Sequence, residues 1–128
     1  MSTLRVTNIQ DTAGANSLTT EQVYNGSAKA WVNFNGTTTS PSTIRVSFNV
    51  SSVTKSATGT YTINFSTALI SATNCVAGTA TNNNSNAEGI ISGSSTLSST
   101  ASALTNFTTR GGGGTANDYQ NVCIVVFR

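Results

Sequence analysis

Histidine is absent from this sequence, and charged residues make up only 8% of it. General acid–base catalysis usually draws on histidine or on a pair of carboxylates. No serine or cysteine lies in a recognisable nucleophile motif. We therefore expect a protein that is not an enzyme and that uses no cofactor or metal, with a glycosidase-type carboxylate pair as the less favoured alternative. The four carboxylates are Asp11, Glu21, Glu88 and Asp118.

Basic residues are equally sparse, and they form no run along the chain. A phosphate-binding surface needs clustered lysine and arginine, and an electrostatic membrane anchor needs the same. No apolar stretch approaches the ~20 residues of a membrane-spanning helix, and the polar start Met1–Thr3 is not typical of a secretory signal peptide. We expect no nucleic-acid partner and no membrane insertion, and a chain that stays in the cytosol until it assembles. The net charge of +2 comes from Arg5, Lys29, Arg45, Lys55, Arg110 and Arg128 set against the four acids.

Cysteine is also scarce, because Cys75 and Cys123 are the only two. Two cysteines are too few for a disulfide framework, and without histidine they cannot complete a zinc site. In a cytosolic protein the favoured interpretation is that both are small buried hydrophobic residues. A disulfide between them is the alternative, and it requires Cα atoms about 4.4–6.8 Å apart on neighbouring strands.

Serine, threonine, asparagine and glycine fill most of the remaining sequence, and they favour strands and turns over helices. At 128 residues the chain fits one domain. Residues 1–26 are predicted to contain a short strand over Thr3–Ile9 and the only helix, over Thr19–Gly26. Thr19 or Thr20 can cap this helix, and Gly26 offers a left-handed stop. We expect residues 1–26 to serve in attachment or oligomerisation.

Strict alternation of apolar and polar residues begins after this segment, over Ala28–Asn35, Ile44–Val50 and Tyr61–Phe65. In the second of these runs, Ile44, Val46, Phe48 and Val50 are predicted to share one face. Weaker strand patterns follow at residues 75–80, 89–93 and 102–109. Together these patterns predict an all-β fold, an antiparallel β-sandwich over residues 27–128 with one short N-terminal helix.

The last strand, Asn121–Phe127, is apolar on both faces. Such a strand must be covered twice, either inside a sandwich or at a subunit interface. We therefore expect this strand to be buried on both sides, and Val126→Asp to abolish assembly. The candidate interface residues are Val122, Ile124, Val126 and Phe127.

Three polar loops separate the strands, at residues 37–42, 82–86 and 111–117. Loops held by a rigid scaffold often carry recognition, and asparagine and threonine offer hydrogen-bond donors and acceptors to sugars. Trp31 could also stack on a sugar ring, but packing under the helix or against another subunit is the favoured interpretation. The candidate receptor-binding residues are Thr37, Thr38, Thr39, Asn82, Asn83, Asn84, Asn86 and Asn117.

Part of the sequence resembles a known family. The residues that carry the resemblance are Asn8–Asp11, Ala28–Thr37 with its Lys-Ala-Trp-Val-Asn-Phe core, Ile44–Arg45, Ser47–Thr54, and Gly59, Tyr61, Thr62, Asn64 and Phe65. They look like the carboxyl-terminal domain of tail-fibre and other virion structural proteins of tailed bacteriophages, notably cyanophages and other marine phages. The closing segment Asn121–Arg128 is similar to the way those domains end.

The resemblance implies a tail-fibre component that is usually homotrimeric and whose tip contacts the bacterial surface. Its partners would be copies of itself, other virion tail or baseplate proteins, and host cell-surface polysaccharide. It would be made in the host cytoplasm and end up in the virion.

Most such domains end longer chains, whereas this one stands nearly alone. That difference leaves open a complete short fibre, a cap on another fibre or a head decoration. The alternatives are therefore a capsid-decorating or tail-connecting protein without receptor binding, and a soluble lectin-like sugar-binding module.

Overall fold

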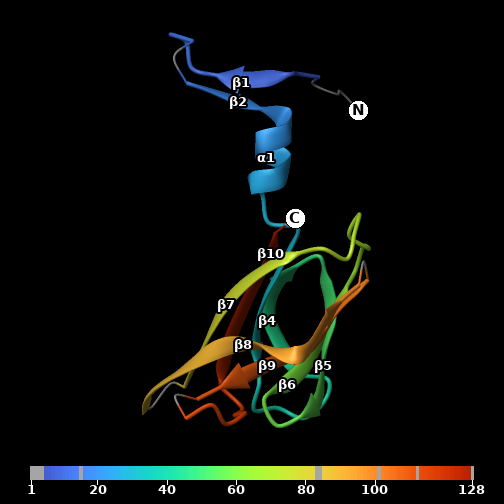
Figure 1. Ribbon diagram of the computed structural model, residues 1–128, viewed down its shortest axis with the longest axis vertical. Coiled ribbons are helices and arrows are strands. Elements are labelled where there is room, and N and C mark those ends of the chain that lie inside the picture. The colour runs from blue at the N-terminus through green and yellow to red at the C-terminus, as the bar shows by residue number, and fades with distance from the viewer. Residues whose placement is uncertain (1–4, 15, 83–84, 101, 112, 128) are drawn as a thin grey trace.

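The computed structural model describes residues 5–14, 16–82, 85–100, 102–111 and 113–127. These residues form ten strands and one short helix (Figure 1). The strands are β1 (Asn8–Gln10), β2 (Ser17–Thr19), β3 (Ala30–Asn35), β4 (Thr43–Phe48), β5 (Val50–Ala57), β6 (Thr60–Phe65), β7 (Cys75–Asn82), β8 (Ser85–Ser99), β9 (Ala103–Arg110) and β10 (Asn121–Phe127), and the helix is α1 (Thr20–Gly26).

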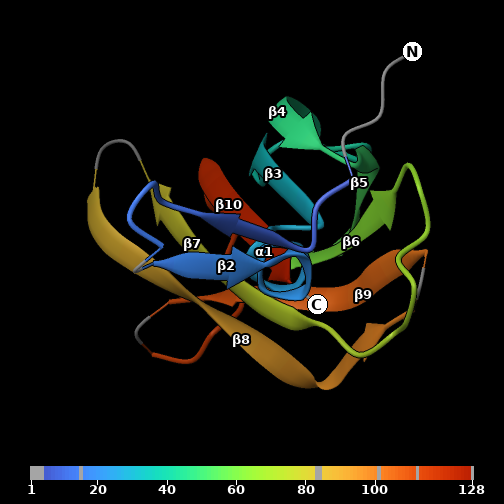
Figure 2. The same cartoon turned by 90° about the horizontal axis from the view of Figure 1, so that it is seen from above.

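Strands β3 to β10 form one antiparallel sheet in the order β4-β3-β10-β7-β8-β9-β6-β5. Seen from above, the sheet curls until its two halves face each other (Figure 2). The prediction of an all-β antiparallel sandwich is therefore confirmed. The last strand of the chain lies between β3 and β7, inside the sheet rather than at its edge.

Alternate side chains of the strands fill the space between the two halves. β3 contributes Ala30, Val32 and Phe34, and β6 contributes Tyr61 and Ile63 from the opposite half. The rings of Phe34 and Tyr61 meet edge to face, with their centroids 5.1 Å apart. Each such side chain stabilises the fold by about 1.5–3 kcal/mol through burial, so this core is the main source of stability.

Strands β1 and β2 and helix α1 project beyond one end of the sandwich (Figure 1). Thr19 caps α1 as expected, and the Gln22 side chain completes a capping box by accepting from the Thr19 amide at 2.8 Å. The predicted left-handed stop at Gly26 is wrong. Gly26 is the last helical residue, and Ser27 follows in an extended conformation that leads the chain toward β3. No helix in the described part of the chain combines the length and the apolar character needed to cross a membrane.

Of the strand expected over Thr3–Ile9, Thr3 and Leu4 lie outside the described residues, and in the described part β1 begins only at Asn8. Its partner β2 went unrecognised in the sequence, since a three-residue strand shows too little alternation to stand out. The pairing places Ile9 opposite Leu18.

The single strand expected over Ile44–Val50 is in fact the end of β4 and the start of β5. Asn49 separates them with a positive φ of 55°, a conformation that asparagine tolerates better than most residues. Its side chain holds the corner by donating to the Lys29 and Thr67 carbonyls and accepting from the Thr67 amide. The chain therefore crosses from one half of the sandwich to the other at Asn49.

The expected inward face of β4 is also wrong, because the pairing of β3 with β4 shifts between Asn33 and Phe34. Phe34 pairs with Ile44 and Asn33 pairs with Val46, so Arg45 is an extra residue on β4 that forms a bulge opposite Asn33 and Phe34. One inserted residue reverses which side chains point inward. Val46 and Phe48 are consequently 53% exposed.

The loop expected at residues 82–86 is a tighter hairpin. β7 ends at Asn82 and β8 begins at Ser85, so Asn86 lies in a strand rather than in a loop. Asn83 and Asn84 lie outside the described residues. The long β8 also extends well beyond the strand expected at residues 89–93, because its partners β7 and β9 hydrogen-bond to different parts of it.

Candidate interaction surfaces

The polar loops predicted to carry recognition lie together at the end of the sandwich opposite α1 (Figure 1). We call this end the loop tip, defined as residues 36–42, 111 and 113–120 with Asn82. A backbone hydrogen bond joins two of its parts, because the Gly36 amide donates to the Tyr119 carbonyl oxygen at 2.9 Å. The Gln120 amide donates to the Asn82 side-chain oxygen at 3.1 Å. The tip is thus one connected surface built from segments far apart in the sequence.

A charged cluster holds the tip to the core. One oxygen of Asp118 lies 2.5 Å from the Lys55 ammonium, and the other accepts from the Gly59 amide at 2.7 Å. The Tyr61 hydroxyl lies 3.0 Å from both Asp118 and the Gly36 carbonyl oxygen, which are two acceptors for its single proton. Asp118 therefore ties the loop before β10 to the β5–β6 turn and to β6.

Position 59 in this cluster can only be glycine. Its φ is +63°, and an added Cβ would lie 2.7 Å from the Thr109 carbonyl oxygen and 2.8 Å from the Asn117 backbone. A side chain would strain the backbone and push the two segments apart. The turn between β5 and β6 is consequently fixed against the tip.

Partial burial pushes the pKa of Asp118 upward, but the hydrogen bonds from Lys55, Gly59 and Tyr61 outweigh it and hold the pKa below its usual value. Burial and the adjacent Asp118 charge raise the pKa of the Tyr61 hydroxyl. Tyr61 thus keeps its proton and Asp118 its charge near neutral pH. The pair acts as a structural anchor.

The predicted receptor residues differ in how exposed their side chains are and in the hydrogen bonds that they make. Thr37, Thr39 and Asn117 are exposed at the tip. Thr38 is half-buried, and its hydroxyl donates to the Asn35 carbonyl and accepts from the Thr43 amide. Asn82 is likewise engaged with Gln120. The Thr37 hydroxyl is engaged as well, because it donates to the Asn35 side-chain oxygen at 2.7 Å. Thr37, Thr38 and Asn82 therefore shape the loops, and the exposed side chains of Thr37, Thr39 and Asn117 form the surface that a ligand would meet.

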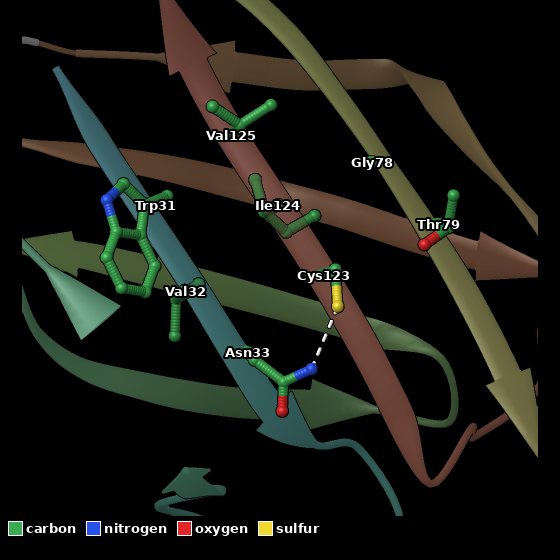
Figure 3. A pocket seen from close by; sticks show the side chains of 8 residues that line it. All are labelled: Trp31, Val32, Asn33, Gly78, Thr79, Cys123, Ile124 and Val125. Atoms are coloured by element: carbon green, nitrogen blue, oxygen red, sulfur yellow. Dashed lines mark hydrogen bonds between the residues drawn. The ribbon is translucent and has the colours of Figure 1, made fainter. Parts of the chain in front are cut away.

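A second surface, which the sequence reasoning only partly anticipated, covers the outside of β4, β3, β10 and β7. We call it the outer face and define it by Trp31, Val46, Phe48, Cys123 and Val125. Strand pairing places Phe48 beside Trp31 and Trp31 beside Val125, in one apolar row across three strands. Over β3, β10 and β7 this face is hollowed into a shallow groove of about 330 Å³ (Figure 3).

Polar contacts on the outer face are few. The Asn33 side-chain amide donates to the Cys123 sulfur at 2.8 Å, as Figure 3 shows, and its oxygen accepts from Arg45 at 3.2 Å. Trp31 and Val125 are half-buried, and Phe48 is mostly exposed. Burial of a face like this one against another surface stabilises the contact through removal of apolar area from water.

The structure corrects the predicted interface residues on β10. Val122, Ile124 and Val126 are 0%, 3% and 1% exposed within a single chain, so they belong to its own core. Their neighbours Cys123 and Val125 lie on the other side of the strand, as does Phe127, the one predicted interface residue on this side. The doubly apolar pattern correctly predicted that the strand is covered. The pattern does not indicate which side of the strand faces the chain's own core.

Both interpretations of the cysteines, as buried hydrophobic residues or as a disulfide, are wrong. Cys75 and Cys123 are free and exposed, rather than buried or bridged. Register places Cys75 opposite Phe127 and Cys123 opposite Thr79, so the two thiols lie four residues apart along the strands. Trp31 lies on the outer face, beside Phe48 and Val125 of the neighbouring strands.

Comparisons with known proteins add no relative: no protein-family model matches the chain, and neither a curated protein nor a solved structure matches it.

Proposed function

We propose that the chain is a non-enzymatic structural component of a bacteriophage virion, a tail-fibre or fibre-tip module that forms a homotrimer and presents its loop tip to the host surface. The phage assignment and the number of three rest on the sequence resemblance described above. The observation that carries self-association is the outer face, where Trp31, Phe48 and Val125 form an apolar row on a chain with very few charges. Closed symmetric assembly would cover this face.

The arrangement of the two ends supports a fibre tip over a capsid decoration. Residues 5–26 project from one end of the sandwich, and the loop tip lies at the other (Figure 1). An end-on attachment to other tail or baseplate proteins at the end that carries the projecting segment would leave Thr37, Thr39 and Asn117 facing outward. Their hydroxyl and amide groups suit hydrogen bonding to cell-surface polysaccharide.

Analytical ultracentrifugation tests this proposal. The wild-type chain should sediment as a trimer, and Val125→Asp should sediment as a monomer with an unchanged far-UV circular dichroism spectrum. The charge lies on the outward side of β10, where it opposes burial against another copy without entering the core. A wild-type chain that stays monomeric at micromolar concentration would contradict the assembly.

A triple variant at the loop tip, with Thr37, Thr39 and Asn117 each changed to alanine, provides the matched control. It should assemble like the wild type and lose binding on a glycan array. The single change Thr73→Ala, an exposed threonine near the opposite end, should leave both properties intact. Glycan binding that survives the triple change would remove the display role and leave a purely architectural protein.

A further inference from the structure

The segment formed by β1, β2 and α1, which we call the arm (residues 5–26), carries apolar side chains with no core of their own. Ile9 and Leu18 form a cross-strand pair, yet they are 54% and 52% exposed. Leu18 and Val23 occupy the two positions of a hydrophobic staple around the Thr19 cap, and Val23 is 41% exposed. α1 itself contains no buried residue. A two-stranded hairpin and a two-turn helix are marginal in water without further packing.

The arm cannot obtain that packing from its own sandwich. Lys29, at the start of β3, donates to the Tyr24 carbonyl and to the Ser27 hydroxyl, and its ammonium lies 3.7 Å from the centre of the Tyr24 ring. The Lys29 amide also donates to the Val126 carbonyl at 2.8 Å. These contacts brace α1 so that it points away from the body, and they leave β1 and β2, which carry Ile9 and Leu18, at the far end of the arm (Figure 1).

We propose that the arm of one copy docks its apolar patch, formed by Ile9, Leu18 and Val23, on the outer face of a neighbouring copy. This inference rests on the proposed self-association and names the contact that forms it. Each chain then supplies one arm and one face, and a ring of such head-to-tail contacts uses every arm and covers every face. The surfaces are complementary, since each is apolar and exposed in the single chain.

Charge also favours this pairing. Arg45 lies beside the outer face, held by Asn33, while the arm carries two exposed acids, Asp11 and Glu21, against one exposed base, Arg5, so its formal charge is −1. Opposite charges at the rim of an apolar contact fix its orientation and disfavour other partners. A bundle of three arms would instead bring together three segments of the same net charge. Its helices would also be too short, because α1 has seven residues and a coiled coil needs several heptads.

Disulfide trapping in the full-length chain tests the contact. The variant combines Leu18→Cys with Cys75→Ser, so that Cys123 on the outer face is the remaining native thiol. Isotopically heavy and light chains are mixed, allowed to assemble and oxidised with copper phenanthroline in air, and the linked peptides are mapped by mass spectrometry. We expect mixed heavy–light peptides in which the thiol introduced at position 18 is joined to Cys123.

Sedimentation of the same sample separates the failure of this inference from the failure of the proposed assembly. A trimer with no cross-link, or with the introduced thiols joined only to each other, would overturn arm docking and leave self-association standing. A monomer would overturn both. Thr115→Cys with Cys75→Ser gives the collisional background, because Thr115 is exposed at the loop tip, away from the arm.

A charge on the arm provides an independent measurement. Leu18→Asp should weaken self-association at least tenfold in sedimentation equilibrium while the sandwich stays folded. Ile70→Asp is the matched control, because Ile70 is 72% exposed and lies outside both the arm and the outer face. Equal association of the Leu18→Asp chain and the wild type would contradict the inference.

Discussion

The sandwich and the arm of this protein are built from similar residues and yet are held together in different ways. In the sandwich, side chains such as Phe34 and Tyr61 are fully buried between two halves of one sheet. In the arm, the pair Ile9–Leu18 stays mostly in water. The contrast lies in what faces each apolar row, because the sandwich supplies its own opposite surface, whereas the described residues of the chain supply none for the arm.

Stability should therefore be uneven along the chain. Regions with many buried apolar contacts open only with the whole domain, whereas regions without them open locally at little cost. We expect β3, β6 and β10 to share the global stability and the arm to fray independently until another surface covers it. The following changes test that division, from the largest expected effect to the smallest.

Val126→Asp should abolish folding of the sandwich. Val126 is 1% exposed, so the substitution places an unpaired carboxylate in the core at a cost comparable to the 5–15 kcal/mol total stability of a typical domain. The sequence alone predicted a loss of assembly, but the buried position changes the expected defect to unfolding. Circular dichroism should show loss of the strand spectrum, whereas the adjacent Val125→Asp should retain it. A folded Val126→Asp chain would contradict the assignment of this side of β10 to the core.

Asp118→Ala should destabilise the sandwich by about 2 kcal/mol at pH 7, because it removes the charged acceptor of Lys55, Gly59 and Tyr61. Urea unfolding followed by tryptophan fluorescence measures the difference. Glu21→Ala removes an exposed carboxylate from the arm and should leave the urea midpoint unchanged. If both substitutions shift the midpoint equally, the tip is not anchored through Asp118.

The same carboxylate predicts a pH dependence. The folded protein holds the pKa of Asp118 below the unfolded value of about 3.9. Its contribution is therefore fully present above that value and is lost as the pH falls through the lower folded-state pKa. The gap in unfolding free energy between the wild type and Asp118→Ala should be constant from pH 7 to about 5 and narrow toward pH 2. A gap that stays unchanged at low pH would contradict this anchor.

Thr19→Ala should have the smallest effect, and it should be confined to the arm. Loss of the cap costs the helix about 1 kcal/mol, or roughly a fivefold loss of hydrogen-exchange protection. The amide of Gln22, which donates to the Thr19 hydroxyl, reports the change by NMR. The amide of Ile124 in β10 should exchange as before. Equal loss of protection at both sites would show that the arm and the sandwich unfold together.

Local patterns in the sequence were informative where a residue's neighbours along the chain decide its structure. The cap at Thr19, one of two threonines that the sequence offered, and the alternation over β3 and β6 follow from local residue types, and both are present in the structure. The corner at Asn49 and the bulge at Arg45 could not be foreseen in this way. Each depends on a partner strand, and together they turn Val46 and Phe48 outward.

The candidate surfaces show the same limit. The polar loops were visible in the sequence, but their meeting at one end depends on Asp118 and Gly36 joining segments from distant parts of the chain. The doubly apolar last strand indicated two covered sides. Which side faces the chain's own core was decided only when β10 paired between β3 and β7.

By itself, the sequence determined that the chain forms strands around a single core and ends in a strand with two apolar sides, because alternation and composition act locally. The tertiary structure alone decided that the loops gather at one end and that Trp31 and Val125 share an outward face. Those outcomes depend on the register between strands far apart in the chain, and a shift of one residue in that register sends a side chain to the opposite face.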